Sequence, residues 1–120
     1  MAPAVSDPSP SQLMQVSRAL MRVYKDNLGR GPDRAFAHYA GPDAIVCFLE
    51  GTLTPVERTL TTIAAHARLR ETRTMIQDAA EAEMRRLVEA IAGRQVVAST
   101  SGFDVRADVA TEAFQFAPGA

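Results

Sequence analysis

The sequence has one cysteine, no tryptophan and no long apolar run, and each absence removes a class of protein. A single cysteine excludes a disulfide framework and a zinc site built from cysteines. Without a run of about 18 apolar residues, the chain has no transmembrane helix. Thirteen Lys and Arg residues against fourteen Asp and Glu residues give a net charge of −1, without the basic excess of nucleic-acid-binding proteins. We therefore expect no nucleic-acid partner and no direct membrane insertion.

The composition that is present is typical of one globular domain. The chain has 120 residues, of which 47% are hydrophobic and 22% charged, close to the averages for soluble domains. Prolines near the start predict a flexible tail over residues 1–8. After this tail we expect a single domain over residues 9–116 and a short C-terminal tail over residues 117–120. The first residues lack the basic and apolar regions of a secretory signal, so we expect a cytoplasmic protein.

A first helix is predicted to begin at Pro10, with Ser9 as its N-cap and Gln12 closing a capping box. Apolar residues then recur every three or four positions, at Leu13, Val16, Leu20, Tyr24 and Leu28. This spacing predicts a helix with one apolar face, and Gly29 is expected to end it.

Residues 34–50 predict a β-hairpin whose turn lies at Ala40-Gly41-Pro42-Asp43. The strand over 44–50 is β-branched, aromatic and apolar on both faces. Such a strand lies either in the covered centre of a sheet or under a partner protein. The strand over 34–39 carries a weaker alternating pattern.

A second helical region is predicted over 55–92. Thr54, Pro55 and Glu57 suit the N-cap, N1 and N3 positions of a capping box, and Gly93 is expected to end the region. Its apolar stripe comprises Leu69, Ile76, Ala80, Met84, Leu87 and Ile91, widened by Met75, Ala79 and Val88. The pattern fits either one bent helix or two helices, the first running to about Ala67, joined near Arg68.

Two strands complete the predicted fold, over 95–100 and 109–116, with a polar turn over 101–108 between them. Ala110, Phe114 and Phe116 share one face of the last strand. The resulting order is α-β-β-α(α)-β-β. Because the strands come in hairpins, we expect an α+β fold of two layers, with an antiparallel four-stranded sheet packed against two or three helices.

No constellation of residues indicates catalysis. His38 and His66 lie apart, without the converging ligands of a metal site. Cys47 lies inside a strand, where a thiol behaves as a small apolar side chain. We therefore expect no catalytic residue, no metal site, no cofactor and no enzymatic activity.

The chain resembles the MpsC-type domain of a sodium-translocating, membrane-potential-generating system. The similarity rests on short runs in order over residues 12–116. They are Val16-Ser17-Arg18-Ala19, Tyr24-Lys25, Leu28-Gly29-Arg30-Gly31-Pro32, Leu49-Glu50-Gly51-Thr52-Leu53-Thr54 with Glu57 and Leu60, Arg73, Gly93-Arg94 with Val96, and finally Val109 and Phe114. The resemblance implies a role near membrane ion or bicarbonate handling. A chain without a membrane span does not move sodium itself, so we expect an accessory or regulatory protein that contacts a membrane transport component.

Four polar residues within these runs are the candidates for partner or anion binding. Arg30 and Arg73 are expected to bind an anionic group of a partner. Glu50 and Glu57 flank the tight turn over residues 49–54. For Glu57, helix capping is the alternative role.

A homodimer is expected because Met14 and Met21 widen the apolar arc of the first helix beyond what one small core needs; the alternative is a single well-covered core helix. The alternative function is a sensor of a nucleotide or organic anion, which would be bound between the sheet and the long helix through Arg30 and Arg73.

Overall fold

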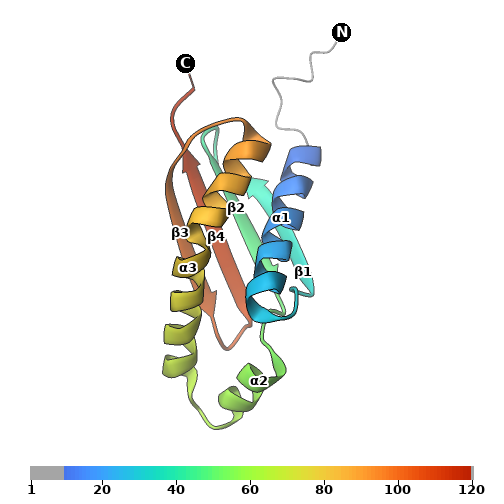
Figure 1. Cartoon of the computed structure of the whole chain (residues 1–120), viewed down its shortest axis with the longest axis vertical. Coiled ribbons are helices and arrows are strands. Elements are labelled where there is room, and N and C mark those ends of the chain that lie inside the picture. The colour runs from blue at the N-terminus through green and yellow to red at the C-terminus, as the bar shows by residue number, and fades with distance from the viewer. Residues whose placement is uncertain (1–9, 120) are drawn as a thin grey trace.

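The computed structural model describes residues 10–119 and has the predicted element order (Figure 1). The helices are α1 (Pro10–Leu28), α2 (Pro55–Thr62) and α3 (His66–Ala92), and the strands are β1 (Arg34–Tyr39), β2 (Ala44–Glu50), β3 (Val96–Asp104) and β4 (Val109–Phe116). The α+β prediction is confirmed. The N-cap predicted at Ser9 and the tail over 1–8 lie outside the described residues. The side chain of Gln12 bonds to the Ile91 carbonyl and to the Tyr39 hydroxyl.

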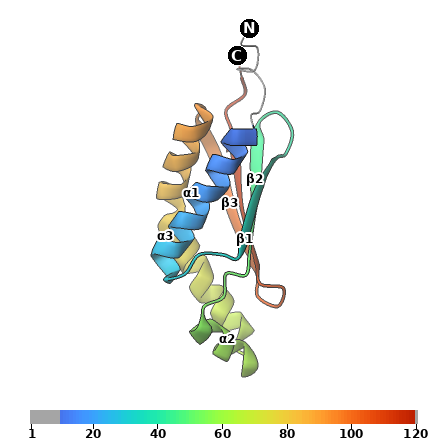
Figure 2. The same cartoon turned by 90° about the vertical axis from the view of Figure 1, so that its right-hand side faces the viewer.

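The sheet is antiparallel throughout, with strand order β1-β2-β4-β3. Helices α1 and α3 both lie on one of its faces, while α2 and the start of α3 extend past its end (Figures 1 and 2). The apolar strand β2 is central, as one of the two interpretations expected, but the described residues cover only one of its faces. Its residues Ile45, Cys47 and Leu49 are buried under the helices.

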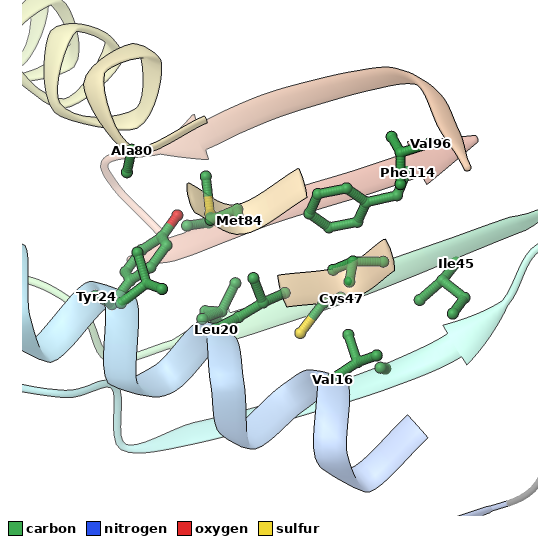
Figure 3. Packing of buried hydrophobic residues seen from close by; sticks show 14 of the residues in the cluster. Val16, Leu20, Tyr24, Ile45, Cys47, Ala80, Met84, Val96 and Phe114 are labelled. Carbon is green, nitrogen blue, oxygen red and sulfur yellow. The ribbon is translucent and has the colours of Figure 1, made fainter. Parts of the chain in front are cut away.

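The core lies between the two helices and this face of the sheet (Figure 3). Val16, Leu20 and Tyr24 of α1 face Cys47 of β2 and Phe114 of β4. The predicted face of α1 is therefore its buried face. The predicted C-caps are also confirmed, because Gly29 and Gly93 end α1 and α3 with φ of 84° and 68°.

The second helical region consists of two helices, and the prediction placed both the end of α2 and the junction too late. Helix α2 ends at Thr62, and Ala64 adopts a left-handed φ of 59° before α3 begins at His66. The break needs no glycine or proline because tertiary contacts impose it. Helix α2 is held against the loop that follows β2, while α3 returns along the sheet, and one straight helix cannot do both.

The polar turn predicted over 101–108 is also too long, because β3 continues to Asp104. Two polar groups at the start of this segment have partners within the fold. The Ser101 hydroxyl bonds to Glu112, and the Gly102 carbonyl accepts from Gln77. Phe103 packs against both apolar clusters.

The buried face of α3 differs from the predicted apolar stripe. Met75 and Ala79 are exposed, whereas Arg73 and Gln77 are buried. The buried residues are Leu69, Arg73, Gln77, Ala80, Met84 and Val88. Two polar side chains occupy this face because each has polar partners inside the fold.

The other face of the sheet carries no helix (Figure 2). Cross-strand pairing places two rows of side chains at its centre, Phe36-Phe48-Thr111-Gly102 and His38-Val46-Ala113-Thr100. The rings of Phe36 and Phe48 lie 5.8 Å apart. None of these residues is buried, so the described chain leaves two largely apolar rows uncovered. We call these two rows the bare face. The neighbouring row on the same face, Arg34-Glu50-Val109-Asp104, carries charges.

Candidate functional site

The four residues predicted to bind a partner surround one loop, residues 51–54, between β2 and α2. Glu50 precedes the loop and Glu57 follows it, while Arg30 and Arg73 reach it from α1's C-terminal side and from α3. The loop begins at Gly51, whose φ is 71° and where any side chain would overlap Asp33. Arg30, Glu57 and Arg73 therefore bond to this loop, and Glu50 directly precedes it.

Arg73 has no exposed surface. Its guanidinium donates to both carboxylate oxygens of Glu57, with Nε–Oε2 and Nη2–Oε1 distances of 3.0 and 2.9 Å. It also donates to the carbonyl and hydroxyl oxygens of Thr52, at 2.7 and 2.9 Å, and lies 4.4 Å from the centre of the Phe103 ring. Contact of Arg73 with an outside anion stays a prediction, and it would require this internal network to open.

Glu57 has two roles at once. Thr54 Oγ1 accepts a hydrogen bond from the Glu57 backbone at 3.2 Å, and Glu57 Oε1 accepts one from the Thr54 backbone at 2.9 Å. The predicted capping box is therefore present. The same carboxylate neutralises Arg73, so it joins the start of α2 to α3 and to the 51–54 loop. Buried charges are stable only with such pairing.

Arg30 and Glu50 are more open to solvent. Arg30 donates to the Leu53 carbonyl and to the Asp33 carboxylate, both at 2.7 Å. The first of these bonds holds the 51–54 loop at Leu53. Glu50 pairs with Arg34 across the β1–β2 ladder at 3.4 Å. Partner binding by these two residues stays a prediction.

Asp108 is a loop residue whose role the sequence did not reveal beyond its place in a turn. Its carboxylate accepts from the backbone N–H groups of Thr52 and Leu53 and from the Thr52 hydroxyl, at 2.8 to 3.2 Å. It adopts a left-handed φ of 55°, which Asp tolerates better than most residues. The β3–β4 turn is thereby tied to the 51–54 loop.

A second buried carboxylate, Glu112 of β4, lies between the sheet and both long helices. One oxygen, Oε2, accepts from the Tyr24 hydroxyl at 2.6 Å and from the Gln77 amide at 3.2 Å. The other oxygen, Oε1, bonds to the Ser101 hydroxyl. Gln77 also donates to Tyr24 and to the Gly102 carbonyl. We call Glu112, Tyr24, Gln77 and Ser101 the Glu112 centre.

The electrostatics of the Glu112 centre follow from burial. Glu112 is 1% exposed, and desolvation raises its pKa from 4.5 to about 7 against the opposing effect of its three hydrogen-bond donors. Burial and the nearby Glu112 charge raise the pKa of Tyr24 above its ordinary value. The same two causes raise the pKa of Cys47, opposite Glu112 on β2, to about 12. This thiol is therefore protonated and buried, which does not suit a nucleophile.

The alternating pattern of β4 could have revealed Glu112. The sequence placed Ala110, Phe114 and Phe116 on one face, and a period of two puts residue 112 on that face as well. Likewise, Arg73 and Gln77 fall on the helical repeat that contains Leu69, Ala80 and Met84. The sequence analysis selected Arg73 as an anion-binding candidate but did not predict its burial, and it did not select Gln77 or Glu112.

The match to known sequences decides the family. The family model described as "Na+-translocating membrane potential-generating system (MpsC)" matches residues 12–118. The chain belongs to the MpsC family. The matched region contains the 51–54 loop and the Glu112 centre. No curated protein and no solved structure matches the chain.

This MpsC-family chain offers no centre for metal chemistry within residues 10–119, because no three His, Cys, Asp or Glu residues gather there. None of the helices in that range is long and apolar enough to cross a bilayer.

Proposed function

We propose that this MpsC-family protein is a non-enzymatic accessory or regulatory protein of a membrane ion-transport system, acting through protein contacts as a homodimer. The observation that carries the proposal is the bare face of the sheet. Phe36, Phe48 and Val46 are the kind of side chains that protein interfaces cover. The family description supplies the link to ion transport.

A second copy of the chain is the occupant we propose for the bare face. The two central rows contain no Asp, Glu, Lys or Arg, so contact between them buries no such charge, and the charged row Arg34-Glu50-Val109-Asp104 would lie at the rim of the interface. Four strands about 4.8 Å apart and about seven residues long give the whole sheet face, including the charged row beside the bare face, an area of roughly 450 Å² per copy. Burying roughly 900 Å² in total corresponds to a weak, concentration-dependent dimer.

Sedimentation equilibrium over a range of protein concentrations tests the dimer. We expect reversible dimerisation that the double variant Phe36→Thr/Phe48→Thr loses, since threonine retains β-propensity but removes the aromatic contact. Met75→Thr is the matched control, because Met75 is 71% exposed on α3. Dimerisation that survives in the sheet variant, or a wild type that is monomeric throughout, would contradict the proposal.

A second experiment tests the accessory role. A tagged copy at native level is purified from its host in mild detergent, and its partners are identified by mass spectrometry. Recovery of a membrane transport component with the wild type and with Met75→Thr, but not with Phe36→Thr/Phe48→Thr, is expected. Recovery of the protein alone contradicts the accessory role.

Ligand sensing is a second candidate, favoured by a groove of about 530 Å³ between the start of α3 and the β3–β4 turn. His66, Arg70 and Arg106 line it together with Glu71 and Asp104. Its volume is that of small-molecule sites. A thermal-shift screen of nucleotides and organic anions tests this function. A ligand at about 100 times its dissociation constant stabilises the fold by about 2.7 kcal/mol, and the variant Arg70→Gln/Arg106→Gln should lose that shift.

A further inference from the structure

The Glu112 centre contains a carboxyl group without a counter-ion, although charged, titratable and polar groups from four elements lie around it. They are Tyr24 from α1, Arg73, Gln77 and Glu81 from α3, Cys47 from β2 and Ser101 from β3. The guanidinium of Arg73 is committed to Glu57 and Thr52. Glu81 pairs with Arg85 and repels a charge on Glu112. Over residues 10–119, no cation therefore pairs with Glu112.

A buried carboxylate without a counter-ion is costly, and such a group usually takes up a proton instead. The hydrogen bonds of the centre can accommodate this neutral form. Oε2 continues to accept from Tyr24 and Gln77, while a protonated Oε1 donates to the Ser101 hydroxyl oxygen. Every polar group of the centre then has a partner.

Ser101 connects the buried acid to solvent. It lies on the edge strand β3, and it is exposed although it bonds to a carboxyl group that is almost fully buried. In the neutral form its own O–H is free to donate to water. A proton can thus pass between Glu112 and solvent by rotation of one hydroxyl, without opening the core.

We propose that Glu112 is a reversible proton-binding site, reached from solvent through Ser101, and that loss of this proton loosens the packing of α1 and α3 on the sheet. The raised pKa of Glu112 is consistent with this assignment. Loosening follows because the ionised carboxylate requires water, and its partners Tyr24 and Gln77 hydrogen-bond β4 from the two helices that cover the sheet. The protein would therefore respond to the pH of its compartment.

Carbon-13 NMR titration of the Glu112 side-chain carboxyl in the full chain tests the binding site. The resonance is assigned through the Glu112 backbone, so the measurement needs no variant. We expect a midpoint near pH 7, compared with the ordinary value of 4.5. A midpoint below about 5 in the folded protein would overturn the proposal.

Amide hydrogen exchange tests the coupling to helix packing. After correction for intrinsic exchange, the amides around Tyr24 and Gln77 should lose at least about tenfold protection as pH rises through the midpoint in the wild type. Glu112→Gln is the matched control, because its amide retains the shape and can donate to Ser101. The control should show no such loss, and an equal loss in both proteins would overturn the coupling.

Discussion

Glu57 and Glu112 are both buried carboxyl groups in contact with α3, yet the fold neutralises them in opposite ways. Glu57 is 8% exposed and receives two bonds from a guanidinium, whereas Glu112 is 1% exposed and receives bonds only from a phenol, an amide and a hydroxyl. The first is a fixed ion pair and the second an acid that can lose its proton. Burial alone therefore does not decide whether such a carboxyl group is permanently ionised. The charge of its hydrogen-bond partners decides it.

The two sites also differ in what they connect. The Glu57–Arg73 pair joins α2, α3 and the 51–54 loop beyond the end of the sheet, where few apolar side chains are buried. The Glu112 centre lies at the edge of the main core, between both long helices and the sheet. The permanent Glu57–Arg73 ion pair stabilises the small apolar cluster. The titratable Glu112 lies beside the main core, where a change in helix packing would affect most of the fold.

The largest expected effect comes from breaking the ion pair. Arg73→Met leaves Glu57 charged without its partner and removes the donors to Thr52, so urea unfolding should show a loss of about 3–5 kcal/mol. The double variant Arg73→Met/Glu57→Gln should recover part of this loss, because no unpaired charge remains. A double variant whose loss equals the sum of the losses of Arg73→Met and Glu57→Gln would show that the pair is not coupled.

The next effect is a pH dependence that only the Glu112 site supplies. Between pH 4.5 and about 7 the folded protein holds a proton that the unfolded chain has lost. Its stabilising contribution is complete below pH 4.5 and is lost as pH rises through about 7. At about 1.36 kcal/mol per pH unit, this interval corresponds to about 3 kcal/mol.

Urea unfolding of the wild type and of Glu112→Gln at several pH values measures this difference. The gap between their unfolding free energies should move by about 3 kcal/mol in favour of the variant as pH rises. Parallel pH profiles would assign the dependence to other groups.

A smaller effect is expected from Tyr24→Phe, which removes one donor to Glu112. The loss of that hydrogen bond should cost about 1–2 kcal/mol. Because the bond favours the ionised carboxylate, its removal should also raise the pKa of Glu112 further. The NMR titration of the variant should therefore have a higher midpoint, and a lower midpoint would contradict the assigned direction of this bond.

The smallest effect concerns the capping half of the Glu57 site. Thr54→Ala removes the hydroxyl acceptor of the capping box but leaves the Arg73 contacts in place. We expect a loss of about 1 kcal/mol by thermal unfolding. A loss as large as that of Arg73→Met would mean that the cap, rather than the ion pair, holds α2.

The sequence predicted those features that local chemistry determines. The capping box at Thr54 and Glu57 and the helix ends at Gly29 and Gly93 were found because each signal lies within four residues of chain. The break between α2 and α3 was misplaced because no local residue causes it. It depends on contacts between the 51–54 loop and Arg73, which is some 20 residues further along the chain.

The candidate site could be predicted only in part, because many of its contacts join residues that are far apart in the chain. Four polar residues were selected, and the structure gathers them around one loop. Periodicity places Arg73 on the buried face of α3, but it does not reveal the partners Glu57 and Thr52. Glu112 was overlooked although its alternation with Ala110 and Phe114 placed it inside. Its partners come from α1, α3 and β3, so the three-dimensional packing was needed to assemble the centre.

The most direct test of the difference between the two carboxyl groups applies one chemical change to both. Glu57→Gln and Glu112→Gln each remove a single negative charge and keep the side-chain shape, and their unfolding free energies are measured at about pH 8. We predict that Glu57→Gln loses about 3–5 kcal/mol while Glu112→Gln is at least as stable as the wild type. Equal losses in both variants would contradict the account, because they would mean that Glu112 is as firmly ionised and paired as Glu57.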